Sequence, residues 1–322
     1  PLLNDQLPIE SQLVHRLPDC LNAEIVLGTV TSIKDAVEWL SYTYLNIRMK
    51  KSPQVYQLQD GSDSQVKQRL IDLAHSALLK LNKSGLIIYD EKTGIIDSSD
   101  LGRISSYYYV SYTTMEEYSQ CLSSSIINDI ELFKIFSLSA EFKYISVREG
   151  EKQELLKLLD KVPVPIKESI DVPASKINVL LQAYISRLSL DGFALKSDMC
   201  YIQQSAQRLM RALFEISLKR KWSYVAYRCL TICKMILHKQ WSIESPLRQF
   251  GINNPQNKLT YSIINRIEKC QFSFDRFLHL SSAEVGELIR MPSVGKDIHK
   301  LIHQVPKLNL KGQIQPLTRS II

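Results

Sequence analysis

Glycine and proline are scarce in this chain, with 11 and 12 among 322 residues, which argues against fibrous or low-complexity material. Charged residues make up 23% of the chain and apolar residues 45%. That balance is typical of a folded protein with buried cores and excludes an intrinsically disordered one. A chain of this length is expected to form two to three domains.

Targeting and membrane signals are also missing. No apolar run approaches the ~20 residues that a membrane-spanning helix needs, and no secretory pattern begins the chain. The first residue is proline rather than methionine, so we expect a fragment that begins inside a larger protein. The cysteines are scattered without a disulfide pattern, which predicts reduced thiols in the cytosol or nucleus. They are Cys20, Cys121, Cys200, Cys229, Cys233 and Cys270.

The sequence has no recognisable catalytic motif. Gly295-Lys296 is followed by Asp297, where the phosphate-binding loop of nucleotide hydrolases has serine or threonine. Neither a dinucleotide-binding fingerprint nor a G-x-S-x-G turn occurs. We therefore predict no catalytic residue and no bound cofactor in this region.

Two residue pairs have partial metal-ligand spacing. Cys229 and Cys233 are four residues apart on a predicted helix, without a second Cys or His pair nearby in the sequence. His299 and His303 have the same spacing but lack the glutamate of the metalloprotease pattern. We predict that the cysteines pack in a core and that the chain binds no metal.

The net charge of the chain is +7. A basic balance favours a nucleic-acid partner, because lysine and arginine neutralise phosphates and release counterions. Many ordinary proteins are equally basic, so the charge alone does not decide between the two.

The first part of the chain is predicted to be a winged-helix domain, residues 1–112. Helical patterns cover 8–27, broken at Pro18, then 33–53 and 63–83. Two short apolar runs then flank a turn that ends in Gly94, which is a β-hairpin pattern. Winged helices bind DNA in some proteins and only pack against other domains in others.

The rest of the chain is predicted to be mainly helical. Residues 113–252 should form a helical bundle, which a capping box of Thr113 and Glu116 would begin. Residues 253–305 should form a helix-loop-helix domain of three to four short helices. Residues 306–322 have strand character and would be the first strand of a truncated immunoglobulin-like β domain. The helical segments of the bundle are 124–138, 148–160, 173–190, 198–220 and 223–238.

The segment 198–220 is the strongest candidate for a binding element. Ser197 is a suitable cap for its start, and one face of the helix is apolar. The opposite face carries polar and aromatic side chains every three to four residues, a mixture that can contact sugars, phosphates and base faces without demanding one sequence. An ordinary solvated helix face would have the same pattern. The stripe consists of Tyr201, Gln204, Ser205, Arg208, Arg211, Glu215 and Lys219.

A second candidate contact lies at Gly295 and Lys296. These residues follow a short connection between two predicted helices, as in a helix-hairpin-helix. In that arrangement backbone N–H groups at a helix N-terminus face a phosphate, and the lysine adds a positive charge. A plain connection between two helices is the alternative interpretation.

A set of ordered sequence strings resembles the superkiller-like group of superfamily 2 helicases, and within it the spliceosomal helicases that separate paired small nuclear RNAs. The resemblance spans essentially the whole chain. Relatives have cysteine where this chain has Ser245, and often glycine where it has Gln207. The strings are PIES at 8–11, LNAEIV at 21–26, DAVEWL at 35–40, YLNIRM at 44–49, LFKIFS at 132–137, KINVLLQ at 176–182, QSAQRLMR at 204–211, SPLRQF at 245–250, ELIRMP at 287–292 and QPLTRS at 315–320.

The resemblance implies a winged helix followed by a Sec-sixty-three homology unit, from the N-terminal cassette of such a helicase. It implies that RecA-like motor domains, which bind ATP and Mg²⁺, lie upstream in the parent chain. The region would guide single-stranded RNA during spliceosome activation in the nucleus, with spliceosomal proteins as partners and no membrane. The segment 198–220 would be the ratchet helix, with Ser205 and Arg208 facing the RNA.

Three alternatives stay open at this point. The chain resembles the same region of a paralogous ribosome-rescue and DNA-repair helicase. It also resembles an inactive helicase cassette that serves as a protein-docking scaffold. A membrane translocation protein shares the homology unit, but its J domain and membrane spans are absent from this sequence.

Overall fold

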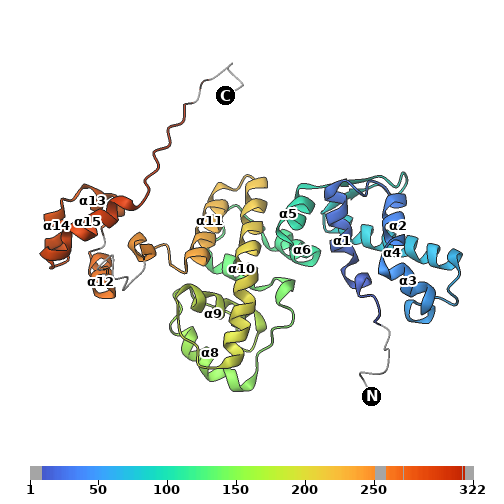
Figure 1. The fold of residues 1–322 in the computed structure, drawn as a ribbon, viewed down its shortest axis with the longest axis horizontal. Helices are drawn as coiled ribbons and strands as arrows, with labels where there is room; N and C mark the ends of the chain where they lie inside the picture. The colour runs from blue at the N-terminus through green and yellow to red at the C-terminus, as the bar shows by residue number, and fades with distance from the viewer. Residues whose placement is uncertain (1–8, 251–258, 271, 314, 316–322) are drawn as a thin grey trace. The chain divides into compact units, whose positions relative to one another are not determined.

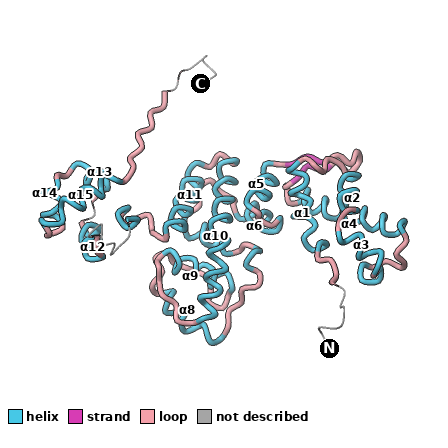
Figure 2. Tube along the Cα trace, in the orientation of Figure 1, coloured by secondary structure: helices cyan, strands magenta, loops and turns pink. Residues whose placement is uncertain are grey.

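The computed structural model describes residues 9–250, 259–270, 272–313 and 315. These residues fall into two compact units, one ending at Lys239 and one beginning at Gln240. Figure 1 labels the helices and strands, and Figure 2 shows that helices dominate the fold. The described residues form one small sheet, of strands β1 and β2. The predicted mainly α class is confirmed. The boundaries predicted at 112, 252 and 305 stay predictions.

The first unit begins with the predicted winged helix. Its two strands pair antiparallel, with Ile88 opposite Asp97, and Ser32 bridges to Ile95 beside them. A capping box of Ser32 and Asp35 starts the second helix. The elements are α1 (Leu13–Leu27), α2 (Ile33–Ser41), α3 (Tyr44–Lys51), η1 (Pro53–Tyr56), α4 (Asp63–Lys83), β1 (Ile87–Tyr89) and β2 (Ile96–Ser98).

Two expectations for this part are wrong. Helix α1 continues through Pro18, because Pro18 and its neighbours Leu17 and Leu21 are buried and their packing outweighs the lost backbone hydrogen bond. The helix expected over 33–53 is instead divided into α2 and α3. Thr43 adopts an extended conformation between them, and its hydroxyl donates to the Leu40 carbonyl at the end of α2.

A helix that was not predicted, α5, follows the hairpin. The Ser99 hydroxyl accepts the Gly102 N–H and caps its start, and Tyr109 ends it in the left-handed conformation. Nine elements of regular helix or short 3₁₀ turn, counting α5, complete the described part of the first unit. They are α5 (Asp100–Tyr108), α6 (Tyr112–Cys121), α7 (Asp129–Ser137), η2 (Ala140–Phe142), η3 (Glu149–Glu151), α8 (Lys152–Leu159), α9 (Pro173–Ile185), α10 (Phe193–Lys219) and α11 (Ser223–His238).

Two predicted helix starts also need correction. Helix α6 is capped by Ser111, whose hydroxyl accepts the Thr114 N–H, rather than by Thr113. Helix α10 begins at Phe193, so Ser197 lies inside it. The Glu154 carboxylate fixes the earlier start by accepting the backbone N–H groups of Asp191 and Gly192, at 2.6 and 3.0 Å.

Helix α10 lies at the centre of the first unit. It packs along α11, α9 and α5, and its inward side chains Leu209, Met210 and Leu213 are fully buried. Because a 27-residue helix held on several sides cannot bend or rotate freely, its remaining face is displayed in a fixed orientation.

The described residues of the second unit form four short α-helices between 261 and 304, which agrees with the three to four that were expected. A capping box of Ser281 and Glu284 is present in this unit. Buried Leu259, Ile263 and Ile298 belong to its separate core. The elements are η4 (Pro246–Phe250), α12 (Tyr261–Lys269), α13 (Phe274–His279), α14 (Ser282–Leu288), η5 (Pro292–Val294) and α15 (Gly295–Gln304).

The strand expected after residue 306 is not formed by the described residues 306–313 and 315. Leu308 and Leu310 are almost fully exposed there. A strand is stable only when its backbone pairs with another strand, and none of the described residues provides one beside this tail.

Candidate nucleic acid interface

A buried ion cluster fixes the first half of α10. Lys176 on α9 is fully buried, and its ammonium lies 2.5 Å from the Glu151 carboxylate and 2.6 Å from the Asp198 carboxylate of α10. It also donates to the Ser146 carbonyl at 2.9 Å. Arg148 contacts both acids from the half-exposed side. Buried charges are tolerated only when paired in this way, so the cluster locks α10 against α9 in one register.

Arg208 lies at the middle of α10 and is half-buried. Its Nη1 donates to the Tyr109 carbonyl and, at 3.3 Å, to the Tyr108 carbonyl, while Nη2 donates to the Ser205 hydroxyl at 3.1 Å. Tyr108 and Tyr109 end α5, where carbonyl groups have no partner within their own helix. Arg208 therefore caps α5 and joins the winged-helix part of the unit to the bundle.

Two further contacts join α5 to α10 along the same stripe. The Tyr108 hydroxyl donates to the Glu215 carboxylate at 2.7 Å, and Lys219 lies 3.0 Å from the Asp100 carboxylate. Burial of the phenol and its bond to Glu215 raise the pKa of Tyr108 to about 12, so the hydroxyl keeps its proton at neutral pH. Helix α5 thus contacts Arg208, Glu215 and Lys219 of the predicted stripe. The sequence analysis did not predict this helix, although a serine before an aspartate, as at Ser99 and Asp100, is a common signal for a helix start.

The other predicted residues of α10 divide into two groups. Tyr201, Gln204 and Arg211 are exposed, and the Tyr201 hydroxyl donates to the Glu141 carbonyl at 2.9 Å. Ser205 is only 8% exposed and lies on the inner edge of the stripe. The open face of α10 is therefore displaced from the centre of the predicted stripe, toward Gln204 and Arg211. Gln207 beside it is half-buried.

Exposed side chains continue along this open face. Lys196, Cys200, Gln204, Arg211 and Leu218 succeed one another at helical intervals, so they share one side of α10. None of these positions except Gln204 and Arg211 was predicted. The exposure of residues outside the expected stripe could not be read from the sequence, because it depends on which helices cover α10.

Gly295 and Lys296 lie together at the first two positions of α15. Gly295 is buried, and a Cβ atom there would lie 2.4 Å from the Ser282 carbonyl oxygen and 2.8 Å from the Gly286 Cα. Glycine is needed at 295 because the backbones of α14 and α15 touch. Lys296 is exposed at the N-terminal end of α15, where helix N–H groups favour anions.

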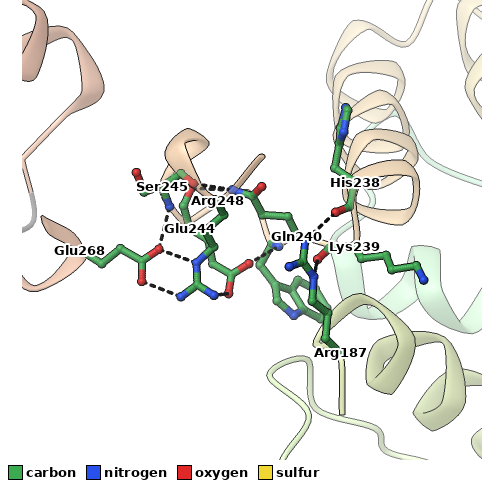
Figure 3. A network of polar contacts seen from close by, with 9 residues as sticks. Arg187, His238, Lys239, Gln240, Glu244, Ser245, Arg248 and Glu268 are labelled. Carbon is green, nitrogen blue, oxygen red and sulfur yellow. Dashed lines mark hydrogen bonds and ion pairs between the residues drawn. The ribbon is translucent and has the colours of Figure 1, made fainter. Parts of the chain in front are cut away.

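Two arginines bind carbonyl or carboxylate oxygens, one near the end of the bundle and one in the second unit (Figure 3). In the first unit, Arg187 donates to the Lys239 and His238 carbonyls at 2.9 and 3.1 Å and so caps α11. In the second unit, Arg248 makes two hydrogen bonds of 2.8 Å to Glu268 and joins η4 to α12. The Arg248 guanidinium lowers the pKa of the Glu268 carboxyl.

The paired cysteines and histidines occupy different surroundings. Cys229 and Cys233 are buried on α11, and burial raises the pKa of each thiol to about 12. His299 and His303 stack on α15 with ring centroids 4.3 Å apart. Across the described part of the chain, no cluster of three or more His, Cys, Asp or Glu side chains has metal-site geometry. Nor does any described helix have the length and apolar character of a membrane span.

Comparison with known proteins adds two matching domains. Residues 10–91 match a winged helix-turn-helix domain family, and residues 98–322 match the Sec63 Brl domain family. The predicted winged helix and homology unit are thereby confirmed.

Relatives of this chain are long helicases and splicing factors. The chain is 53% identical to the U5 small nuclear ribonucleoprotein 200 kDa helicase of Homo sapiens and 50% identical to the DExH-box ATP-dependent RNA helicase DExH12 of Arabidopsis thaliana. It is 48% identical to the pre-mRNA-splicing factor brr2 of Schizosaccharomyces pombe. Each match covers 100% of this chain but only 14–15% of the relative. The resemblance to the spliceosomal helicases is therefore confirmed, and the chain belongs to the Sec63 Brl domain family.

Proposed function

We propose that this chain is the strand-guiding region of an ATP-dependent RNA helicase that unwinds paired small nuclear RNAs during spliceosome activation in the nucleus. The names of its relatives support the helicase and splicing assignments. ATP and Mg²⁺ would be bound by RecA-like motor domains of the parent protein, which supply the energy of strand movement. This region would contribute no catalytic group and would act by holding the strand.

The observation that carries the proposal is the fixed display of α10. The Lys176 cluster holds its first half, and Arg208 and Lys219 join its second half to α5. Between these points, Gln204 and Arg211 are exposed. A rigid rod with an amide and a guanidinium on one side makes contacts that tolerate any base sequence and release readily after each step.

The charge of the chain fits the same function. A net charge of +7 attracts a phosphate backbone without selecting a sequence. Lys296 at the start of α15 would add a phosphate contact in the second unit, together with the Gly295 backbone. Spliceosomal proteins and the motor domains of the same parent are the other proposed partners.

A groove in the winged helix favours one alternative, the protein-docking scaffold. It has a volume of about 510 Å³ and lies among α2, α3 and α4. Its mixed lining of apolar side chains and charges of both signs suits a protein segment better than a nucleic acid. The lining consists of apolar Ile33, Val37, Val66, Leu70 and Ile71, charged Lys34, Glu38, Lys50, Asp63 and Lys67, and polar Ser41 and Asn46.

The test of the strand-guiding function is Arg208→Leu in the full-length parent helicase. We expect RNA duplex unwinding to fall roughly tenfold while RNA-stimulated ATP hydrolysis persists, because the strand loses a charged contact on α10 but the motor is intact. Both rates are measured on the same preparation with a labelled duplex and a coupled ATPase assay.

Arg187→Leu is the matched control, because Arg187 caps α11 as Arg208 caps α5. If loss of a helix cap were the whole effect, both variants would lose unwinding to the same extent. Unwinding by Arg208→Leu at the rate of the unmodified helicase would contradict the role assigned to Arg208.

A further inference from the structure

Three consecutive tyrosines end α5, and their rings lie in very different surroundings. The central ring of Tyr108 is held against α10 by its bond to Glu215. The flanking rings of Tyr107 and Tyr109 belong to residues that are 74% and 85% exposed. Tyr107 meets the edge of Tyr108, with centroids 4.9 Å apart. The middle tyrosine therefore fixes the segment while its two neighbours face outward.

The backbone that carries the two exposed rings is locked. Tyr109 has a φ of 52°, a conformation that is unfavourable for a tyrosine and persists only where its surroundings enforce it. The Tyr109 carbonyl accepts from Arg208. The N–H of the next residue, buried Val110, donates to the Ser105 carbonyl at 2.9 Å. Such a rigid display lowers the entropy lost when a ring is covered by a partner.

The charges beside these rings are mostly positive. Arg103 on α5 is exposed, and α10 contributes Arg208, Arg211 and Lys219. The two acidic groups between them, Asp100 and Glu215, are already engaged by Lys219 and Tyr108. Four positive and two negative side chains leave an excess of two positive charges on this surface, which favours a polyanion over an acidic or neutral protein segment.

We propose that Tyr107 and Tyr109 form a stacking platform for unpaired bases of single-stranded RNA, with Arg208 and Arg211 positioned to meet the adjoining phosphates. Exposed aromatic rings interleaved with guanidinium groups are the arrangement that binds single strands without sequence preference. The platform rests on the proposed function. It extends the strand contact from α10 to α5, where no functional residue was expected from the sequence.

The test uses binding of the complete 322-residue chain to a single-stranded oligouridylate that contains the fluorescent base 2-aminopurine. Stacking on an aromatic ring quenches this base, so both affinity and stacking are followed in one titration. The double variant Tyr107→Leu, Tyr109→Leu should bind roughly tenfold more weakly and lose the quenching, since two stacked bases lose their support. Tyr107→Phe, Tyr109→Phe should retain both signals, because phenylalanine keeps the ring.

Tyr42→Leu provides the matched control, because Tyr42 is a similarly exposed tyrosine at the end of α2. It should leave RNA binding unchanged. If the leucine double variant bound and quenched like the unmodified chain while Arg211→Leu weakened binding, the platform would be refuted and the strand contact on α10 would stand. If the unmodified chain showed no salt-dependent RNA binding, both the platform and the proposed function would be overturned.

Discussion

Replacing Lys176 with methionine should lower the free energy of unfolding of the first unit by about 3–5 kcal/mol, the usual cost of leaving a buried charge without its partner. Lys176 is fully buried between Glu151 and Asp198. Methionine matches the length of the aliphatic stem but offers no positive charge to either carboxylate. Urea unfolding followed by far-ultraviolet circular dichroism gives the difference.

The same substitution should have a smaller effect in acid. The hydrogen bonds from Lys176 and Arg148 hold the pKa of Glu151 below its ordinary 4.5, although burial alone would raise it. The contribution of a carboxyl with a lowered pKa is present at neutral pH and is lost as the pH falls through the folded-state pKa. Without Lys176, burial should raise the pKa of Glu151. As the pH falls toward 4.5, Glu151 should therefore take up a proton in the variant before it does so in the unmodified chain. The neutral carboxyl no longer needs a positive partner, so the difference in stability between the two proteins should shrink.

Arg148→Met is the matched control for this cluster. Arg148 contacts the same two carboxylates, but its side chain is half-exposed, so its loss should lower the free energy of unfolding much less than the loss of Lys176. Equal losses from Lys176→Met and Arg148→Met would show that burial of the ammonium group does not determine the stability of the cluster.

Gly295→Ala should destabilise the second unit by about 1–3 kcal/mol, the usual cost of adding a methyl group to a filled core. The new Cβ would lie 2.4 Å from the Ser282 carbonyl oxygen and 2.8 Å from the Gly286 Cα. All the atoms in its way belong to the backbone, so α14 and α15 must move apart. Hydrogen exchange followed by mass spectrometry should show faster exchange in both helices.

Gly312→Ala is the control for this prediction, because a Cβ at Gly312 meets no atom within 4 Å. It should leave exchange in α14 and α15 unchanged. Protection of these two helices in Gly295→Ala equal to that in the unmodified chain would show that the backbones are not in tight contact there.

Local patterns in the sequence were sufficient for most of the secondary structure. The turn that ends in Gly94 and the capping boxes at Ser32 and Ser281 are determined by neighbouring residues, so they were predictable. The start of α10 was not, because it depends on Glu154, 38 residues away in the sequence from Gly192. Helix α5 was not predicted, because its Ser99 cap follows strand β2 directly and no loop separates the two elements.

In the candidate site, too, the local pattern was predictable and the contacts with distant residues were not. The period of α10 correctly groups Tyr201, Gln204, Arg208 and Arg211 on one side of the helix. Periodicity does not say which neighbouring element covers part of that side. Helix α5 covers the edge near Arg208, and Ser205 is buried at the same edge. Gln204 and Arg211 remain exposed, as do Tyr201 and Lys219.

The most direct test of the strand contact is site-specific photocrosslinking from α10. A benzoylphenylalanine is placed at Gln204 in the full-length parent helicase, and in a second preparation at Lys234, an exposed position on α11. During ATP-driven unwinding, we expect a crosslink from position 204 to the translocating RNA strand and none from position 234. Crosslinks of equal yield from both positions, or none from position 204, would contradict the proposed strand contact on α10.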